Sequence, residues 1–186
     1  MDLPCQRREL LLAGAAALLL PRLASAQKVP NLDVPFVPTP PEVVEKMLDM
    51  AAVQPSDVVY DLGCGDGRIV ITAARKYGAR GVGIDIDPRR ITEARVNARN
   101  EGVASRVHFR VGDLFKSDFS RASVVTLYLL PQINQRLRPQ LWRQLKVGTR
   151  VVSHEFDMGP EWPPEQMEMV GTRKIYFWTI KAEHKG

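Results

Sequence analysis

The fold is decided by the stretch Val58-Val59-Tyr60-Asp61-Leu62-Gly63-Cys64-Gly65-Asp66-Gly67-Arg68. Its first five residues are mostly apolar and predict a buried β-strand at 58–62. The glycines that follow permit positive φ angles and let a ligand approach the backbone closely. A helix predicted at about 68–77 then places its N-terminal amides beside the glycines. The order of strand, glycine turn and helix therefore predicts a site for a nucleotide-type ligand.

Strands and helices continue to alternate along the rest of the chain. Further strands are predicted at 81–86, 106–111, 123–130 and 149–156, further helices at 88–100 and 133–145, and an antiparallel strand pair at 167–170 and 174–181. Strands that alternate with helices form a mostly parallel sheet with helices on both faces. We therefore expect an α/β, doubly wound, Rossmann-like fold whose ligands bind at the carboxyl ends of the strands.

The composition indicates one ordinary globular domain. A chain of 186 residues can bury one core, and its 45% hydrophobic and 25% charged residues are typical of soluble domains. The net charge is +5, but the basic residues are scattered among acidic ones, so they only slightly favour an acidic partner. Cys5 falls in the leader described next and Cys64 in the glycine turn, so we expect no internal disulfide in the mature chain.

Residues 1–26 predict an export signal. Arg7-Arg8 precede the apolar run 10–20, and Ala24-Ser25-Ala26 supplies small residues for cleavage. The run is too short to span a bilayer, and the paired arginines resemble a twin-arginine signal. We expect a cleaved, exported or periplasmic monomer whose membrane contact is limited to this segment. The alternatives are an uncleaved membrane anchor and a cytoplasmic protein with a misplaced start codon.

Residues 27–41 form a proline-rich segment, here called the lead-in. Its five prolines prevent a helix and favour an extended chain that lies on the domain. Thr39 is followed three residues later by Glu42, which is the pattern of a capping box, with proline at the first helical position. The pattern predicts a helix that begins at this point and a folded domain at 42–183.

The residues at the strand ends limit the classes of ligand that the site could bind. A dinucleotide fingerprint that starts at Gly63 needs a third glycine where Arg68 stands, and no Gly-Lys-Ser/Thr follows for a P-loop. Asp61 can orient the loop or hold a cationic group, Asp85 can bind a ribose diol, and Asp113 can accept from an adenine amino group. Each carboxylate alone could be a solvated turn residue, but their recurrence at consecutive strand ends favours one ligand site.

These motifs carry a family resemblance. Asp61-Leu62-Gly63-Cys64-Gly65-Asp66-Gly67, Asp85 and Gly112-Asp113 resemble the motif set of class I S-adenosylmethionine-dependent methyltransferases, over about residues 36–181. A narrower resemblance is to the small lysine methyltransferases that include the mitochondrial enzymes acting on ATP synthase and on the adenine nucleotide translocase. It is carried by Phe36-Val37-Pro38-Thr39-Pro40, Val58-Val59-Tyr60-Asp61-Leu62-Gly63, Gly67-Arg68-Ile69-Val70, Leu129-Leu130-Pro131 and Val151-Val152-Ser153-His154.

The resemblance implies seven strands with the last one antiparallel, S-adenosylmethionine over the glycine loop, and the lead-in closing on it. The cofactor-binding residues that it implies are Thr39, Asp61, Gly63, Cys64, Gly65, Gly67, Asp85, Ile86, Asp113 and Leu114. It also implies transfer of a methyl group to a lysine side chain of a protein substrate.

The acceptor end of the site is less specified. Methyl transfer is an in-line displacement, so a lysine amine must first lose its proton. The ends of the fourth and fifth strands offer Tyr128, His154 and Glu155 as candidate catalytic contacts. Tyr128 could equally be core packing, and His154 a hydrogen-bonded structural residue. The fourth strand ends without the Asn or Asp before Pro-Pro that holds a base amine, which disfavours a nucleic-acid acceptor.

We therefore expect a protein-lysine methyltransferase. The alternatives are a small-molecule methyltransferase and a non-catalytic exported binding module that keeps the fold. The sequence has no His/Cys cluster with metal-ligand spacing and no evident Ser/His/Asp set, so we expect no metal site.

Overall fold

The computed structural model describes residues 36–185. The predicted export signal at 1–26 and the lead-in up to residue 35 lie outside the described residues. Within the part of the chain that the structure describes, no helix has both the length and the apolar character that a membrane span needs.

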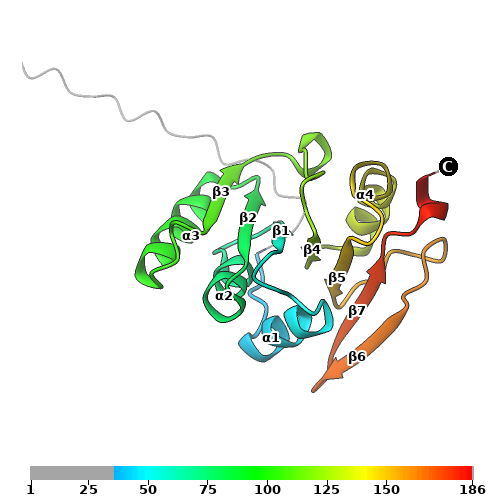
Figure 1. The fold of residues 1–186 in the computed structure, drawn as a ribbon, viewed down its shortest axis with the longest axis horizontal. Helices are drawn as coiled ribbons and strands as arrows, with labels where there is room; N and C mark the ends of the chain where they lie inside the picture. Colours follow the sequence, from blue (N-terminus) through cyan, green and yellow to red (C-terminus); the bar gives the residue numbers. More distant parts are fainter. Residues whose placement is uncertain (1–35, 186) are drawn as a thin grey trace, which may run out of the picture.

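Seven strands form one sheet in the order β3-β2-β1-β4-β5-β7-β6 (Figure 1). The strands are β1 Val58–Leu62, β2 Arg80–Asp85, β3 Val107–Val111, β4 Val124–Leu127, β5 Arg150–His154, β6 Gln166–Val170 and β7 Arg173–Thr179. The helices are α1 Pro41–Met50, α2 Arg68–Tyr77, α3 Pro88–Asn100 and α4 Pro131–Gln144, with 3-10 turns η1 Leu114–Lys116 and η2 Ala182–Lys185.

The pairing confirms the predicted α/β architecture. Strands β1 to β5 pair in parallel, and β7 runs antiparallel to both of its neighbours, β5 and β6. The strand order reverses at β1, which has β2 on one side and β4 on the other. This reversal leaves a crevice at the carboxyl ends of the strands, where ligands of open α/β sheets bind.

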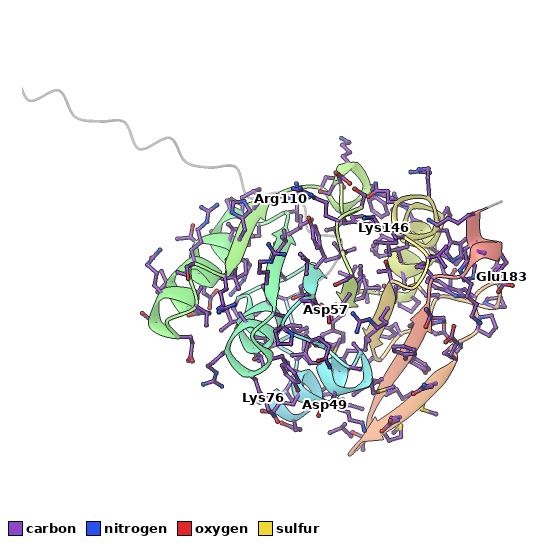
Figure 2. The ribbon with its side chains drawn as sticks, viewed as in Figure 1. Asp49, Asp57, Lys76, Arg110, Lys146 and Glu183 are labelled. Carbon is purple, nitrogen blue, oxygen red and sulfur yellow. The ribbon has the colours of Figure 1, made fainter. Side chains whose placement is uncertain are left out.

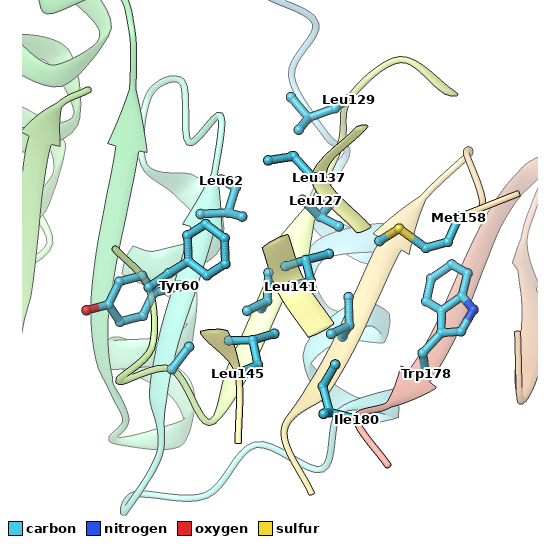
Figure 3. Packing of buried hydrophobic residues seen from close by; sticks show 14 of the residues in the cluster. Tyr60, Leu62, Leu127, Leu129, Leu137, Leu141, Leu145, Met158, Trp178 and Ile180 are labelled. Carbon is cyan, nitrogen blue, oxygen red and sulfur yellow. The ribbon is translucent and has the colours of Figure 1, made fainter. Parts of the chain in front are cut away.

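The central strands β1, β4 and β5 bury both of their faces because helices cover the sheet on both sides. In β1, Val59 packs with α1 and α2, whereas Tyr60 and Leu62 point to the opposite face, where α4 lies. Leu137 and Leu141 of α4 fill that face (Figure 3). A third cluster packs α3 against α2 and β3. The side chains alternate between faces with the period of two that a strand imposes.

A partly buried ion pair joins β5 to the turn before β1. Asp57 accepts hydrogen bonds from the Gln54 amide and the Ser123 hydroxyl, each at 2.7 Å, and pairs with Arg150. Burial opposes the charged carboxylate, but these hydrogen bonds and the arginine charge outweigh it and lower the pKa of Asp57. Figure 2 shows Asp57 near the middle of the molecule, whereas the exposed Glu183 lies at its edge.

The capping box predicted at Thr39 is wrong. Helix α1 begins at Pro41 and its N-cap is Pro40, without a side-chain capping bond. The Thr39 hydroxyl instead lies 3.3 Å from Nδ1 of His154, at the end of β5. A tertiary contact therefore replaces the local one.

Two strands are shorter than predicted. Strand β4 ends at Leu127 because Leu130 takes the N-cap position of α4, which begins at Pro131 rather than at residue 133. Strand β5 ends at His154 because Glu155 adopts a positive φ of 65°, which an extended strand does not permit. Residues 128–130 and 155–156 therefore lie in loops after the strands, at the edge of the sheet where the crevice is.

Candidate active site

A cavity of about 330 Å³ opens at the carboxyl ends of β1, β2, β3 and β4. The lead-in and the first turns of α2 and α3 complete its wall. Nine of the predicted site residues line it: Thr39, Asp61, Gly63, Cys64, Asp85, Ile86, Asp113, Leu114 and Tyr128. The strand ends of a parallel sheet meet at one edge, which is why residues so far apart in the sequence share one cavity.

The conformation of the glycine loop depends on backbone angles that glycine adopts readily. Gly63, Gly65 and Gly67 have φ angles of 85°, 52° and 82°, which side-chain-bearing residues rarely adopt. A Cβ atom on Gly63 would lie 2.7 Å from Cδ2 of Leu129. The Gly63 amide donates to the carbonyl of Ile84 at 2.8 Å, which anchors the loop to β2. Gly65 and Gly67 shape this loop without lining the cavity.

Asp85 organises the loop from the end of β2. One carboxylate oxygen accepts from the Gly65 amide at 2.8 Å, and the other accepts from the Asp87 amide at 2.9 Å. A carboxylate offers about four lone-pair positions, so both oxygens retain capacity to accept ligand hydroxyls. Asp85 is therefore fixed in place and still able to bind a diol.

Asp61 is a buried carboxylate in the wall of the cavity. Its hydrogen-bond partner is the Thr126 hydroxyl on the neighbouring strand β4, at 2.8 Å. Burial raises its pKa to about 7, and the nearby charges of Asp85 and Asp66 add to the effect. Among the described residues no cationic side chain pairs with Asp61. A cationic ligand in the cavity would stabilise the charged form.

Asp113 closes a third side of the cavity. It caps η1, because its side chain accepts from the Phe115 amide at 2.9 Å. Leu114 and Phe115 follow it in the cavity wall and provide an apolar surface. Together they give this side of the cavity both a polar group and an apolar surface, which suits an aromatic base.

The lead-in is fastened over the glycine loop. Arg68 forms an ion pair with Asp66 at 2.5 Å and donates through Nη1 to the backbone carbonyl of Thr39 at 2.8 Å. Phe36 packs on the loop so closely that a Cβ on Gly65 would clash with its ring. The guanidinium of Arg90 lies 4.1 Å from the centre of the same ring. These contacts make the lead-in a wall of the cavity.

Several of these residues escape prediction from the sequence. Asp66, Arg68, Arg90 and Phe115 all line the cavity. The spacing of Asp66 and Arg68 hints at a local pair, but no pattern in the sequence links Arg68 to a carbonyl 29 residues earlier. The basic residues at the start of α3 read as a solvated helix face until the fold brings them beside the lead-in.

Of the three residues predicted to contact the acceptor, one lines the cavity and two do not. Tyr128 lines the cavity, and its ring centre lies 3.9 Å from that of His154. His154 is fully buried and does not line the cavity; burial lowers its pKa to about 4, so its imidazole is neutral at pH 7. Glu155 also lies outside the cavity wall and pairs with Arg173 at 3.0 Å. Tyr128 is thus the predicted acceptor residue that reaches the cavity.

Cys64 lines the cavity as a buried thiol. Burial raises its pKa well above the ordinary value, so it stays protonated at neutral pH. The described residues contain no group of three or more His, Cys, Asp or Glu side chains placed to hold a metal ion.

Comparison with known proteins places the chain among methyltransferases. Residues 61–166 match the family model of the ANTKMT methyltransferase domain. The chain is 46% identical over 157 residues to a protein-lysine N-methyltransferase of Saccharolobus islandicus (strain REY15A), with 82% of this chain and 96% of that protein covered. It is 34% identical over 156 residues to the adenine nucleotide translocase lysine N-methyltransferase of Mus musculus, with 83% and 67% covered.

A solved structure is also similar. It is a crystal structure of an RNA methyltransferase from Salinibacter ruber in complex with S-adenosyl-L-homocysteine. The TM-score is 0.77 at 58% sequence identity, and the match covers 78% of this chain and 95% of that one.

The cavity fits S-adenosylmethionine on three observations. Among the described residues, Asp61 is a buried carboxylate without a cation beside it, Asp85 has free lone pairs, and Asp113 lies with the apolar Leu114 in the cavity wall. The ligand carries a sulfonium cation, a ribose diol and an adenine, which match these groups in order along β1, β2 and β3. The chain therefore belongs to the ANTKMT methyltransferase family and is an S-adenosylmethionine-dependent methyltransferase.

Proposed function

We propose that this enzyme methylates the side-chain amine of a lysine in a protein. The observation that carries the proposal is the 46% identity, over nearly the whole of its length, to a protein that is named a protein-lysine N-methyltransferase. The Mus musculus relative is likewise named for a lysine acceptor. An acceptor end of Tyr128 and Leu129 is compatible with the aliphatic stem of a lysine.

The residues of the chain contribute binding and alignment. S-adenosylmethionine, when bound, supplies an electrophilic methyl group on its sulfonium. Asp61 would balance that positive charge, Asp85 would accept from the ribose hydroxyls, and Leu114 would contact the base. The lead-in would exclude water above the reacting atoms. Alignment and exclusion of water are the main needs of an in-line displacement.

The acceptor proton leaves before transfer. A lysine ammonium has a reference pKa of about 10.4, and an apolar wall at Leu129 disfavours its charged form. His154, with a pKa of about 4, is too weak a base to hold that proton at neutral pH. The initial rate should rise with pH until the acceptor amine is neutral.

RNA is the second candidate acceptor. It is favoured by the structure from Salinibacter ruber, which is described as an RNA methyltransferase. Against it, β4 is followed by Tyr128-Leu129-Leu130-Pro131, which has no Asn or Asp to hold the amine of a base.

One labelling experiment separates the candidates. Purified enzyme is incubated with S-adenosylmethionine labelled in the methyl group and with cell-envelope protein, total RNA or a metabolite extract. We expect methyl-lysine after acid hydrolysis of the labelled protein fraction. Label confined to RNA or to small molecules would contradict the proposal, and the absence of S-adenosylmethionine binding in calorimetry would favour a binding module.

We also propose that residues 1–26 act as an export signal, that the enzyme works outside the cytoplasm, and that it is a monomer. The support is the arginine pair, the apolar run and the small-residue cleavage pattern. Fractionation of native cells with a carboxyl-terminal tag should give a shortened chain in the envelope or periplasm. A full-length chain in the cytoplasm would contradict export, and elution as a dimer would contradict the monomer.

A further inference from the structure

Thr39 joins two sides of the cavity. Its backbone carbonyl accepts from Arg68, which belongs to the donor side through its pair with Asp66. Its hydroxyl lies 3.3 Å from Nδ1 of His154, which is 115 residues away at the end of β5. Thr39 is 3% exposed, and its contact with His154 is buried, whereas the hydrogen bond from Arg68 is partly buried.

His154 transmits this contact to Tyr128. The two ring centres lie 3.9 Å apart at an interplanar angle of 38°. Within the described residues, Nε2 of His154 is buried without a hydrogen-bond partner, so the Thr39 hydroxyl is the hydrogen bond that orients the ring. The charged groups that act on His154 are Glu155 and Arg173, which pair with each other at 3.0 Å.

We propose that Thr39 and His154 are positioning residues that hold Tyr128 in place for the acceptor. The inference rests on the proposed function, because it assigns Tyr128 to the acceptor. The Thr39 hydroxyl therefore acts on the acceptor end through His154, whereas the Thr39 carbonyl binds Arg68.

The substitution Thr39→Val separates these two roles, because it removes the hydroxyl and keeps the carbonyl that Arg68 binds. We expect the Kd for S-adenosylhomocysteine, measured by calorimetry, to stay within about twofold. The kcat of methyl transfer should fall about tenfold, which corresponds to the loss of one hydrogen bond. Thr39→Ser should restore most of the kcat. Thr92→Val is the matched control, since the exposed Thr92 hydroxyl bonds only within α3.

A second readout does not depend on the acceptor. The chain has four tyrosines, so 3-fluorotyrosine labelling should give four fluorine resonances, with that of Tyr128 assigned through Tyr128→Phe. With S-adenosylhomocysteine bound, Thr39→Val and His154→Phe should each shift or broaden the Tyr128 resonance and leave that of Tyr77 unchanged. Circular dichroism checks that each variant is folded.

The outcomes distinguish the inference from the proposed function. A Tyr128 resonance unchanged in both variants would overturn the positioning role, whatever the acceptor. A loss of donor affinity in Thr39→Val as large as its loss of kcat would also overturn it, because Thr39 would then be a donor-binding residue. If the resonance responds but methyl-lysine never forms, the proposed function fails and the link from Thr39 to Tyr128 stands.

Discussion

Asp61 shows how one residue can make cofactor binding depend on pH. Its carboxyl lies in the wall of the cavity and is buried, and its pKa is raised to about 7. Because the folded state holds the proton more tightly than an exposed carboxyl does, the free energy of unfolding should fall as the pH rises through 7. A cationic ligand would offset this loss by stabilising the carboxylate.

Binding of S-adenosylmethionine should therefore release protons near neutral pH. At pH 7 about half of the Asp61 side chains carry a proton, so binding should release about half a proton per site, and almost none at pH 9. Calorimetry in buffers of different ionisation enthalpy measures this number. Asp61→Asn should abolish the release and weaken binding. Equal release from the variant and the natural chain would contradict this assignment.

His154 should make stability depend on pH in the opposite direction. Its folded pKa of about 4 lies below the ordinary value of 6.5, so the unfolded state binds a proton first as the pH falls. Stability from this residue is present above about 6.5 and is lost as the pH falls towards 4, by about 3 kcal/mol.

Urea unfolding at pH 7 and pH 4.5 tests this. The difference in the free energy of unfolding between the two pH values should be smaller in His154→Phe than in the natural chain. The exposed His108 provides the control, and His108→Phe should leave the difference unchanged. The same pH dependence in both variants would show that His154 is not responsible.

At the scale of elements, the glycine loop and helix α2 depend on crowding as well as on backbone angles. Gly67 is the N-cap of α2 with a φ of 82°, and a Cβ there would lie 2.8 Å from the Phe109 ring and 2.9 Å from Cβ of Ala94. Gly148 has a similar φ of 89°, but a Cβ there would meet nothing within 4 Å. A comparison of alanine substitutions at Gly67 and Gly148 therefore separates the cost of backbone strain from the cost of crowding.

Both alanine substitutions should destabilise the protein, but by different amounts. Gly148→Ala should cost about 1 kcal/mol for the left-handed backbone conformation. Gly67→Ala should cost about 1–3 kcal/mol more, because α3 and β3 must move to admit the methyl group. Urea unfolding curves measure both values. Equal costs would show that the close packing of α2 on α3 and β3 contributes nothing at this site.

At the scale of the whole molecule, the ion pair of Asp57 and Arg150 fastens the two halves of the sheet. Arg150 lies on β5, and it also donates to the carbonyls of Ala51 and Ala52 after α1. Asp57 precedes β1 and is 5% exposed. Removal of one partner of such a pair leaves a buried charge that nothing balances.

Arg150→Met should therefore destabilise the fold by about 1.5–3 kcal/mol, because Asp57 loses its charged hydrogen-bond partner. The loss should shrink at low pH, because an unpaired Asp57 would take up a proton. Arg75→Met, which breaks an exposed pair with Glu101, is the control and should cost at most about 1 kcal/mol. Chemical unfolding at pH 7 and pH 4 measures both. A loss in Arg150→Met that matches the control would contradict a structural role for the pair.

The sequence by itself determined the elements, because local patterns carry them. The apolar run at 58–62, the glycines after residue 62 and the proline at position 88 predict β1, α2 and α3 with the bounds that the structure has. The alternation of strands and helices also determined the parallel sheet and the edge at which Asp61, Asp85 and Asp113 meet.

Only the tertiary structure decided the partners of individual side chains. Thr39 reads as a helix cap, but it reaches His154, and Arg68 reads as a missing glycine, but it fastens the lead-in. Glu155 reads as an acceptor contact, but a positive φ turns it out of the strand and away from the cavity. Backbone patterns are local and repeat along the sequence, whereas contacts across 29 or 115 residues depend on how the packed helices and strands bring the chain together.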